Sequence, residues 1–157
     1  MVDPDRIHVV MRFADGFLSA EDTIARHREV LEKHDAVWIG KLGKRLGEKW
    51  IKIANEQVSE GSTTYLFLVQ KEGTEYVAHR CRVLQMSTSV PPDEENLIPK
   101  YYEENGIRRQ VSFWIKLGSL TKVKKGGFPT ANSATDLSDA FFRSFDICFP
   151  PLSLLGL

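Results

Sequence analysis

The stretch DAVWIGKLGKRLGEKW, residues 35–50, predicts a short strand, a glycine-rich turn and the start of a helix in direct succession. Residues 36–40 form the strand, and apolar residues at helical spacing continue over residues 46–59. Trp50 falls on the apolar face of this helix, so we predict that it packs in the core. The stretch is not a nucleotide loop, because its glycines and lysines do not fit the Gly-x4-Gly-Lys-Ser/Thr pattern.

The segments around this stretch alternate between strand and helix patterns. Residues 7–13 are apolar enough for a strand, and residues 19–34 predict a capped helix with one apolar stripe. Residues 63–71 and 74–85 flank a Glu-Gly turn signal and predict a β-hairpin. Both faces of the first hairpin strand are largely apolar, which is typical of a central strand or a closed barrel.

The rest of the chain predicts a long loop and further strands. Residues 87–105 form a loop with one short helical turn, and a loop of this length is usually functional or mobile. Residues 109–116 and 119–123 predict strands, and residues 137–145 carry a short helical pattern. We therefore predict an α+β fold in which a small, strongly curved mixed sheet closes toward a barrel, with helices on its outside. The 157 residues fit one domain.

The charges are balanced in number but unevenly placed along the chain. Five bases lie in residues 41–52 and six in residues 106–127, whereas residues 93–104 hold five acids. If the two basic segments share a face, they form a footprint for a polyanion; otherwise they only solvate the surface. Cys81 and Cys148 lack metal-like spacing and favour a reducing, cytoplasmic setting. No apolar run approaches the roughly 20 residues of a membrane helix, and residues 1–13 lack a hydrophobic signal core, so we expect no secretion signal.

No enzyme signature is found in the sequence. The four histidines form no His-Glu-x-x-His motif, and neither a nucleophile elbow nor a Gly-x-Gly-x-x-Gly turn occurs. His27 and His34 are too far apart along one helix to share a metal easily and fit a partly buried helix surface. The consecutive acids at residues 93–95 fit a solvated loop. We therefore predict no active site, no metal and no cofactor.

Several aromatic residues lie where a pocket could form. Trp38 lies in a short strand just before the glycine turn, and Trp114 shares its strand face with a serine and a lysine. Tyr101 and Tyr102 are adjacent in the long loop. Aromatic rings beside basic segments suit stacking on an unpaired or extruded base. Alternatively, the rings only cover the ends of the barrel.

Four short motifs occur in an order that resembles a known family. VWIGKLGKRL, TTYLFLVQK, LIPKYY and VSFWIKL, within residues 35–123, resemble the N-terminal specificity domains of McrB-type modification-dependent restriction translocases. Those domains belong to the PUA-like superfamily, with the EVE and YTH domains. The resemblance implies a small curved barrel that holds one modified base, flipped out of its strand, in an aromatic cage. It places Trp38, Tyr101, Tyr102 and Trp114 at that cage, with tyrosines where YTH domains use tryptophan.

These observations predict a non-catalytic domain that binds DNA carrying a modified, methylated base and gives specificity to a restriction system. The cations predicted to hold the nucleic-acid backbone are Lys41, Lys44, Arg45, Lys49, Arg108 and Arg109. The resemblance further implies that residues 1–157 are the N-terminal part of a longer protein, with a AAA+ GTPase motor in the same chain and a partner nuclease. Two alternatives remain: an RNA-binding PUA-like module, and a protein-interaction or assembly domain that docks through the aromatic loop.

Overall fold

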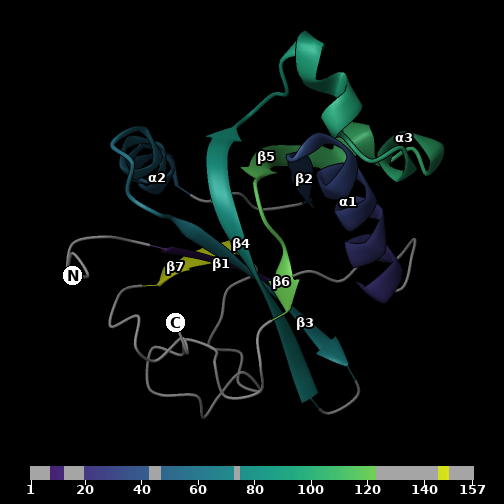
Figure 1. Ribbon diagram of the computed structural model, residues 1–157, viewed down its shortest axis with the longest axis horizontal. Coiled ribbons are helices and arrows are strands. Elements are labelled where there is room, and N and C mark those ends of the chain that lie inside the picture. The colour runs from purple at the N-terminus through teal and green to yellow at the C-terminus, as the bar shows by residue number, and fades with distance from the viewer. Residues whose placement is uncertain (1–7, 13–19, 43–46, 73–74, 123–144, 149–157) are drawn as a thin grey trace.

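The computed structural model describes residues 8–12, 20–42, 47–72, 75–122 and 145–148, which form a curved mixed sheet with helices around it (Figure 1). The strands are β1 (His8–Arg12), β2 (Val37–Leu42), β3 (Tyr65–Glu72), β4 (Glu75–Ser87), β5 (Val111–Leu117), β6 (Thr121–Lys122) and β7 (Phe145–Cys148). The α-helices are α1 (Ala20–His34), α2 (Glu48–Ser59) and α3 (Tyr101–Glu104), and the 3-10 helices are η1 (Pro92–Leu97) and η2 (Arg108–Gln110).

The strand order is β2-β5-β4-β3-β1-β7, and β6 pairs with β4 beside this path. β1 and β3 run parallel, whereas the other ladders are antiparallel. The predicted α+β fold with a curved mixed sheet is therefore confirmed. The sheet is open, because no ladder joins its end strands β2 and β7 among the described residues.

The curvature of the sheet comes from β4, which changes partners along its length. Its first part pairs with β3 up to the Tyr65–Arg82 pair, and its last part pairs with β5 from Val83 to Ser87. The register shifts between Val83 and Gln85, so that Leu84 is one extra residue on this strand. An extra residue of this kind is a β-bulge, which bends the strand and increases its twist. β4 thereby joins the two halves of the sheet around a corner.

Strand alternation sorts the apolar residues of β2 and β5 onto two faces. Val37 and Ile39 pack in the main core, as do Phe113, Ile115 and Leu117 of β5. Their neighbours Trp38 and Trp114 face the other side and belong to a separate cluster. Successive side chains of a strand point to opposite faces, so a single pairing register places both sets at once.

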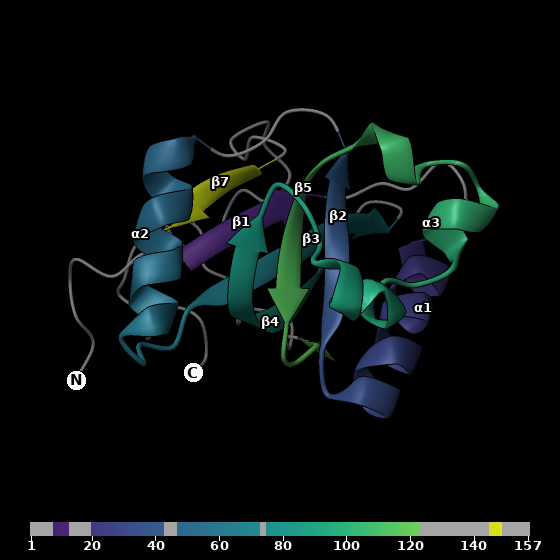
Figure 2. The same cartoon turned by 90° about the horizontal axis from the view of Figure 1, so that it is seen from above.

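The helices cover opposite ends of the sheet. Figure 2 shows α2 beside β4 and β1 at one end, and α1 and α3 together beyond β2 at the other, in agreement with the contacts of α2 with β4 and of α1 with β2. Trp50 packs against the main core from α2, as the sequence predicts. Apolar residues of α1 and α2 that recur at helical spacing supply the rest of this layer.

The predicted elements agree with the structure, with differences in detail. The long loop contains two short helices before η2, namely η1 and α3, where the sequence predicts one helical turn. The strand predicted over residues 36–40 continues to Leu42. Most of the helical pattern at residues 137–145 lies outside the described residues, and Phe145 begins β7.

Asn55 ties α2 to the sheet and gives a test of the packing of that helix. Its Nδ2 donates to the Met86 carbonyl at 3.1 Å, and its Oδ1 accepts from the Met86 N–H at 2.9 Å. Asn55→Ala removes both bonds beside a buried strand, so we expect a loss of about 1–3 kcal/mol in the free energy of unfolding. Denaturant unfolding measures it. The control is Glu56→Ala at the neighbouring exposed position, which we expect to change stability by less than about 0.5 kcal/mol.

Candidate functional site

The four aromatic residues predicted for a base pocket lie together in one buried cluster. Trp38, Tyr101, Tyr102 and Trp114 pack with Ile98 and Ile107, and we call these six residues the aromatic cluster. The four rings are 0–5% exposed. The centre of the Tyr102 ring lies 5.2 Å from the centre of the Trp114 ring and 4.3 Å from the centre of the Tyr101 ring. The structure therefore brings the predicted residues together, in a closed arrangement.

The cluster has a floor on the sheet and a cover from one long segment. Trp38 comes from β2 and Trp114 from β5, and their strands pair directly through Gly40 and Trp114. The other four members come from residues 91–110, which we call the covering segment. α3 has only four residues, too few to be stable alone, so the packing of its two tyrosines holds it in place. Gly106, with φ of 65°, reverses the chain so that Ile107 also enters the cluster.

One hydroxyl group links the cover of the cluster to the sheet and to α1. The Gly40 N–H donates to the Tyr102 hydroxyl at 2.8 Å, and His27 Nε2 lies 2.9 Å from the same oxygen. His27 Nδ1 lies 2.7 Å from the Thr23 carbonyl, which can only accept. Nδ1 therefore carries the hydrogen, and Nε2 accepts from the Tyr102 hydroxyl. Three elements are joined by a polar network that is almost fully buried.

His27 has a larger role than the sequence predicts. The spacing places it on the inner stripe of α1, and it is 1% exposed, but its partner Tyr102 is 75 residues away. No local pattern identifies such a partner. His34 has no part in this network and lines a groove beside the covering segment.

Close packing requires a glycine at position 40. Gly40 lies inside β2 and not in a turn. A Cβ atom at this position would stand 2.8 Å from both methyl groups of Val111 and 3.1 Å from the Tyr102 ring. These distances are shorter than ordinary van der Waals contacts, so a side chain here would displace Val111 of β5 and Tyr102 of the covering segment. The glycine thereby lets Tyr102 reach the backbone of β2.

Trp38 carries a buried donor that has no partner among the described residues. The residue is 0% exposed, and its indole N–H makes no hydrogen bond within that part of the chain. An unmade hydrogen bond of a buried group costs about 1–3 kcal/mol, and such groups are rare in folded proteins. The Lys116 ammonium lies 5.9 Å from the centre of the Trp38 ring and forms an ion pair of 2.6 Å with Glu94. An ion pair between β5 and the covering segment thus stands over this ring.

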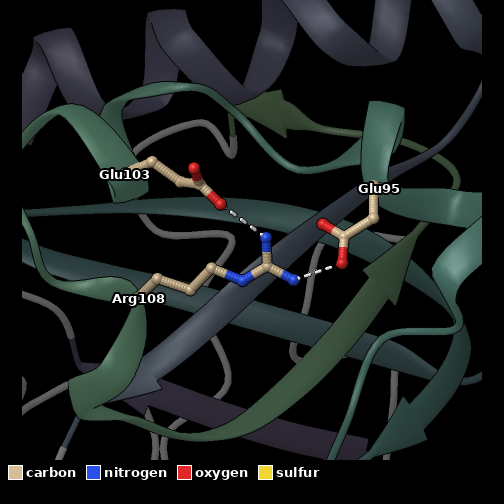
Figure 3. Close-up of polar contacts among 3 residues, drawn as sticks. All are labelled: Glu95, Glu103 and Arg108. Carbon is tan, nitrogen blue, oxygen red and sulfur yellow. Dashed lines mark hydrogen bonds and ion pairs between the residues drawn. The ribbon is translucent and has the colours of Figure 1, made fainter.

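Two of the predicted backbone-binding cations are engaged within the protein. Arg108 donates to Glu95 at 2.5 Å and to Glu103 at 2.8 Å, and so connects η1 with α3 (Figure 3). The hydrogen bond between Arg108 and Glu95 raises the pKa of the guanidinium and lowers the pKa of the carboxyl. Lys41 is only 7% exposed, and burial lowers its pKa.

The other predicted cations differ in their surroundings. Lys49 and Arg109 are exposed, and the Lys49 ammonium lies 4.9 Å from the centre of the Trp50 ring. Lys44 and Arg45 lie outside the described residues. Exposed cations can contact a polyanion without first breaking a bond within the protein, so Lys49 and Arg109 suit this role in the free chain.

A groove of about 550 Å³ runs between α1 and the covering segment. It is lined by charged residues of both signs, and it reaches the aromatic cluster only at Ile98 and Tyr101. Trp38, Tyr102 and Trp114 are absent from its walls. From this groove, a flat ligand could therefore reach the other three rings only if the covering segment moves.

Two further properties bear on the chemistry of the site. In the part of the chain that the structure describes, no three metal-binding side chains gather in one place. None of the helices described is long and apolar enough to cross a membrane.

Comparison with known proteins gives one match. A family model described as Pua-like matches residues 9–144, which include the aromatic cluster and most of the sheet. No curated protein and no solved structure matches the chain significantly. The match agrees with the PUA-like part of the resemblance seen in the sequence motifs.

The Tyr102 hydroxyl gives a direct test of the buried network. Tyr102→Phe keeps the ring but leaves the Gly40 N–H and His27 Nε2 without this partner, so we expect a loss of about 1–3 kcal/mol in unfolding free energy. The matched control is Tyr65→Phe, because the half-buried Tyr65 hydroxyl makes no hydrogen bond among the described residues. Equal stability losses in the two variants would contradict the network.

Proposed function

The chain belongs to the Pua-like family, and from this premise we propose that it binds one methylated DNA base, flipped out of its strand, in the aromatic cluster. Membership in this family indicates nucleic-acid binding. DNA and the methylated base are inferred from the cluster and from the resemblance to McrB-type specificity domains. The domain would itself be non-catalytic and would supply recognition only.

The observation that carries this proposal is the unpartnered indole N–H of Trp38 within a cluster of four aromatic rings. A base is flat, so it can stack on these rings, which contributes about 1–3 kcal/mol without distinguishing sequences. Its ring nitrogens and carbonyl oxygens are acceptors, and the indole N–H finds none among the described residues of the free protein. The cluster thus offers both the stacking surface and a donor that fixes the orientation of the base.

Recognition of the methyl group itself contributes little to the binding free energy. Burial of one methyl group contributes about 1 kcal/mol, which corresponds to roughly fivefold in affinity. Contacts with phosphates contribute most of the affinity for DNA. They also cause this affinity to fall strongly as the salt concentration rises. The exposed Lys49 and Arg109 are proposed for these contacts, together with Lys44 and Arg45 outside the described residues.

We further propose that residues 1–157 form one recognition domain of a longer cytoplasmic protein. Its motor would be a AAA+ GTPase in the same chain, acting with a partner nuclease. This part of the proposal rests on the order of the sequence motifs that resemble McrB-type translocases. The test compares GTP hydrolysis by the native gene product with that by a form truncated after residue 157. Hydrolysis by the native product alone would support the proposal.

The cluster assignment predicts a specific loss of selectivity. Trp38→Phe removes the indole N–H that orients the base and reduces the ring surface that can bury its methyl group, so we expect the preference for modified over unmodified DNA of the same sequence to fall toward one. Fluorescence anisotropy with duplexes that carry one methylated base measures this preference. The control is Trp50→Phe, because Trp50 packs against the main core on α2 and should leave the preference unchanged.

The alternatives are separated by the same titrations. Unchanged selectivity in a folded Trp38→Phe protein would exclude the cluster as the base pocket. Tighter binding of RNA than of DNA would favour the RNA-binding alternative. No binding of either at low salt would favour a protein-interaction domain.

A further inference from the structure

We propose that the covering segment is a lid that an ion pair holds closed, and that Lys116 binds a nucleic-acid phosphate after Glu94 releases it. This inference rests on the proposed function, because it concerns how a base enters the aromatic cluster. In the free protein, Glu94 forms an ion pair with Lys116. In the proposed complex, a phosphate takes the place of Glu94. Lys116 thereby becomes a further nucleic-acid contact, beyond the cations predicted from the sequence.

The arrangement of the cluster defines what the lid covers. Four of its six residues come from the covering segment, whereas Trp38 and Trp114 belong to the sheet. A displacement of the segment would therefore expose these two tryptophans as a floor. The sheet residues are held by the β2–β5 ladder and need not move.

The Glu94–Lys116 pair connects the lid to this floor. Lys116 pairs with Trp38 across the β2–β5 ladder, and its ammonium lies 5.9 Å from the centre of the Trp38 ring. The two charged side chains are 2.6 Å apart and 21–22% exposed. Partly buried pairs are screened less by salt than exposed pairs, so this contact can keep the segment in place.

Arg108 gives the lid internal rigidity. Its two nitrogens bond to Glu95 in η1 and to Glu103 in α3, and all three residues belong to the covering segment (Figure 3). These bonds hold the two short helices together without fixing them to the sheet. The segment can therefore move as one unit when the Glu94–Lys116 pair breaks together with the hydrogen bonds that join the Tyr102 hydroxyl to Gly40 and His27.

A nucleic acid has the chemistry to break that pair. The phosphates that flank a flipped base approach the mouth of the cluster, where they compete with Glu94 for Lys116. They also repel Glu94 and its neighbours Asp93 and Glu95, which favours displacement of the segment. Glu94 thus disfavours the binding of a polyanion that places no base in the cluster. In that case no stacking energy offsets the free energy needed to open the lid.

The test compares Glu94→Gln with Asp93→Asn, which removes the same charge one residue away. Asp93 is exposed and forms no ion pair among the described residues. Both substitutions are placed in a Trp50→Phe background, so that fluorescence reports only Trp38 and Trp114. We expect Glu94→Gln to increase acrylamide quenching without nucleic acid and to tighten binding of methylated DNA roughly threefold to tenfold. Asp93→Asn should leave the quenching unchanged.

Lys116→Gln completes the comparison, because it breaks the same pair from the other side. It should also increase quenching, but it should weaken DNA binding and lower the slope of affinity against salt by about one phosphate contact. Circular dichroism checks that each variant is folded.

The possible outcomes separate the lid from the proposed function. Unchanged quenching in both Glu94→Gln and Lys116→Gln would overturn the lid, even if DNA binds. Increased quenching with no nucleic-acid binding by any variant would support the lid but overturn the role of Lys116 and the proposed function together. Tighter DNA binding by Lys116→Gln would overturn the phosphate contact alone.

Discussion

The pairing of β2 with β5 is the constraint on which the rest of the structure depends. It sends Val37, Ile39 and Ile115 into the main core and leaves Trp38 and Trp114 on the opposite face. A slip of one residue would exchange these faces, burying the tryptophans in the core and exposing its aliphatic residues. The covering segment, the Tyr102 network and the ion pair at Lys116 all require the register that the ladder has.

Local patterns in the sequence predict the fold class and the four aromatic members of the aromatic cluster, but not Ile98 and Ile107. Alternation in β5 separates Trp114 from Phe113 and Ile115, and the long loop that carries Tyr101 and Tyr102 stands out by its length. Local patterns do not predict the contacts between distant segments. The partner of His27, the need for a glycine at position 40 and the acids that bind Arg108 and Lys116 all depend on how separate elements meet.

The acidic residues of the loop form specific ion pairs that their place in the sequence does not predict. The consecutive acids at residues 93–95 predict a solvated loop, and Arg108 and Arg109 are predicted to contact a nucleic-acid backbone. In the structure, Glu94, Glu95 and Glu103 bind the nearby Lys116 and Arg108. The charges of this region therefore first satisfy one another, and a polyanion would have to compete with them. A pocket that is closed in the free protein also lowers the apparent affinity of its ligand, in proportion to the fraction of open molecules.

The change of partners along β4 has a consequence for how the domain unfolds. The same strand is paired with β3 over its first part and with β5 over its last part, around the bulge at Leu84. Neither half of the sheet can then lose its structure without removing a neighbour from the other, which favours a single cooperative unfolding transition. Partial melting of the sheet is thus a costly way to uncover the tryptophans, compared with displacement of the chain that lies over them.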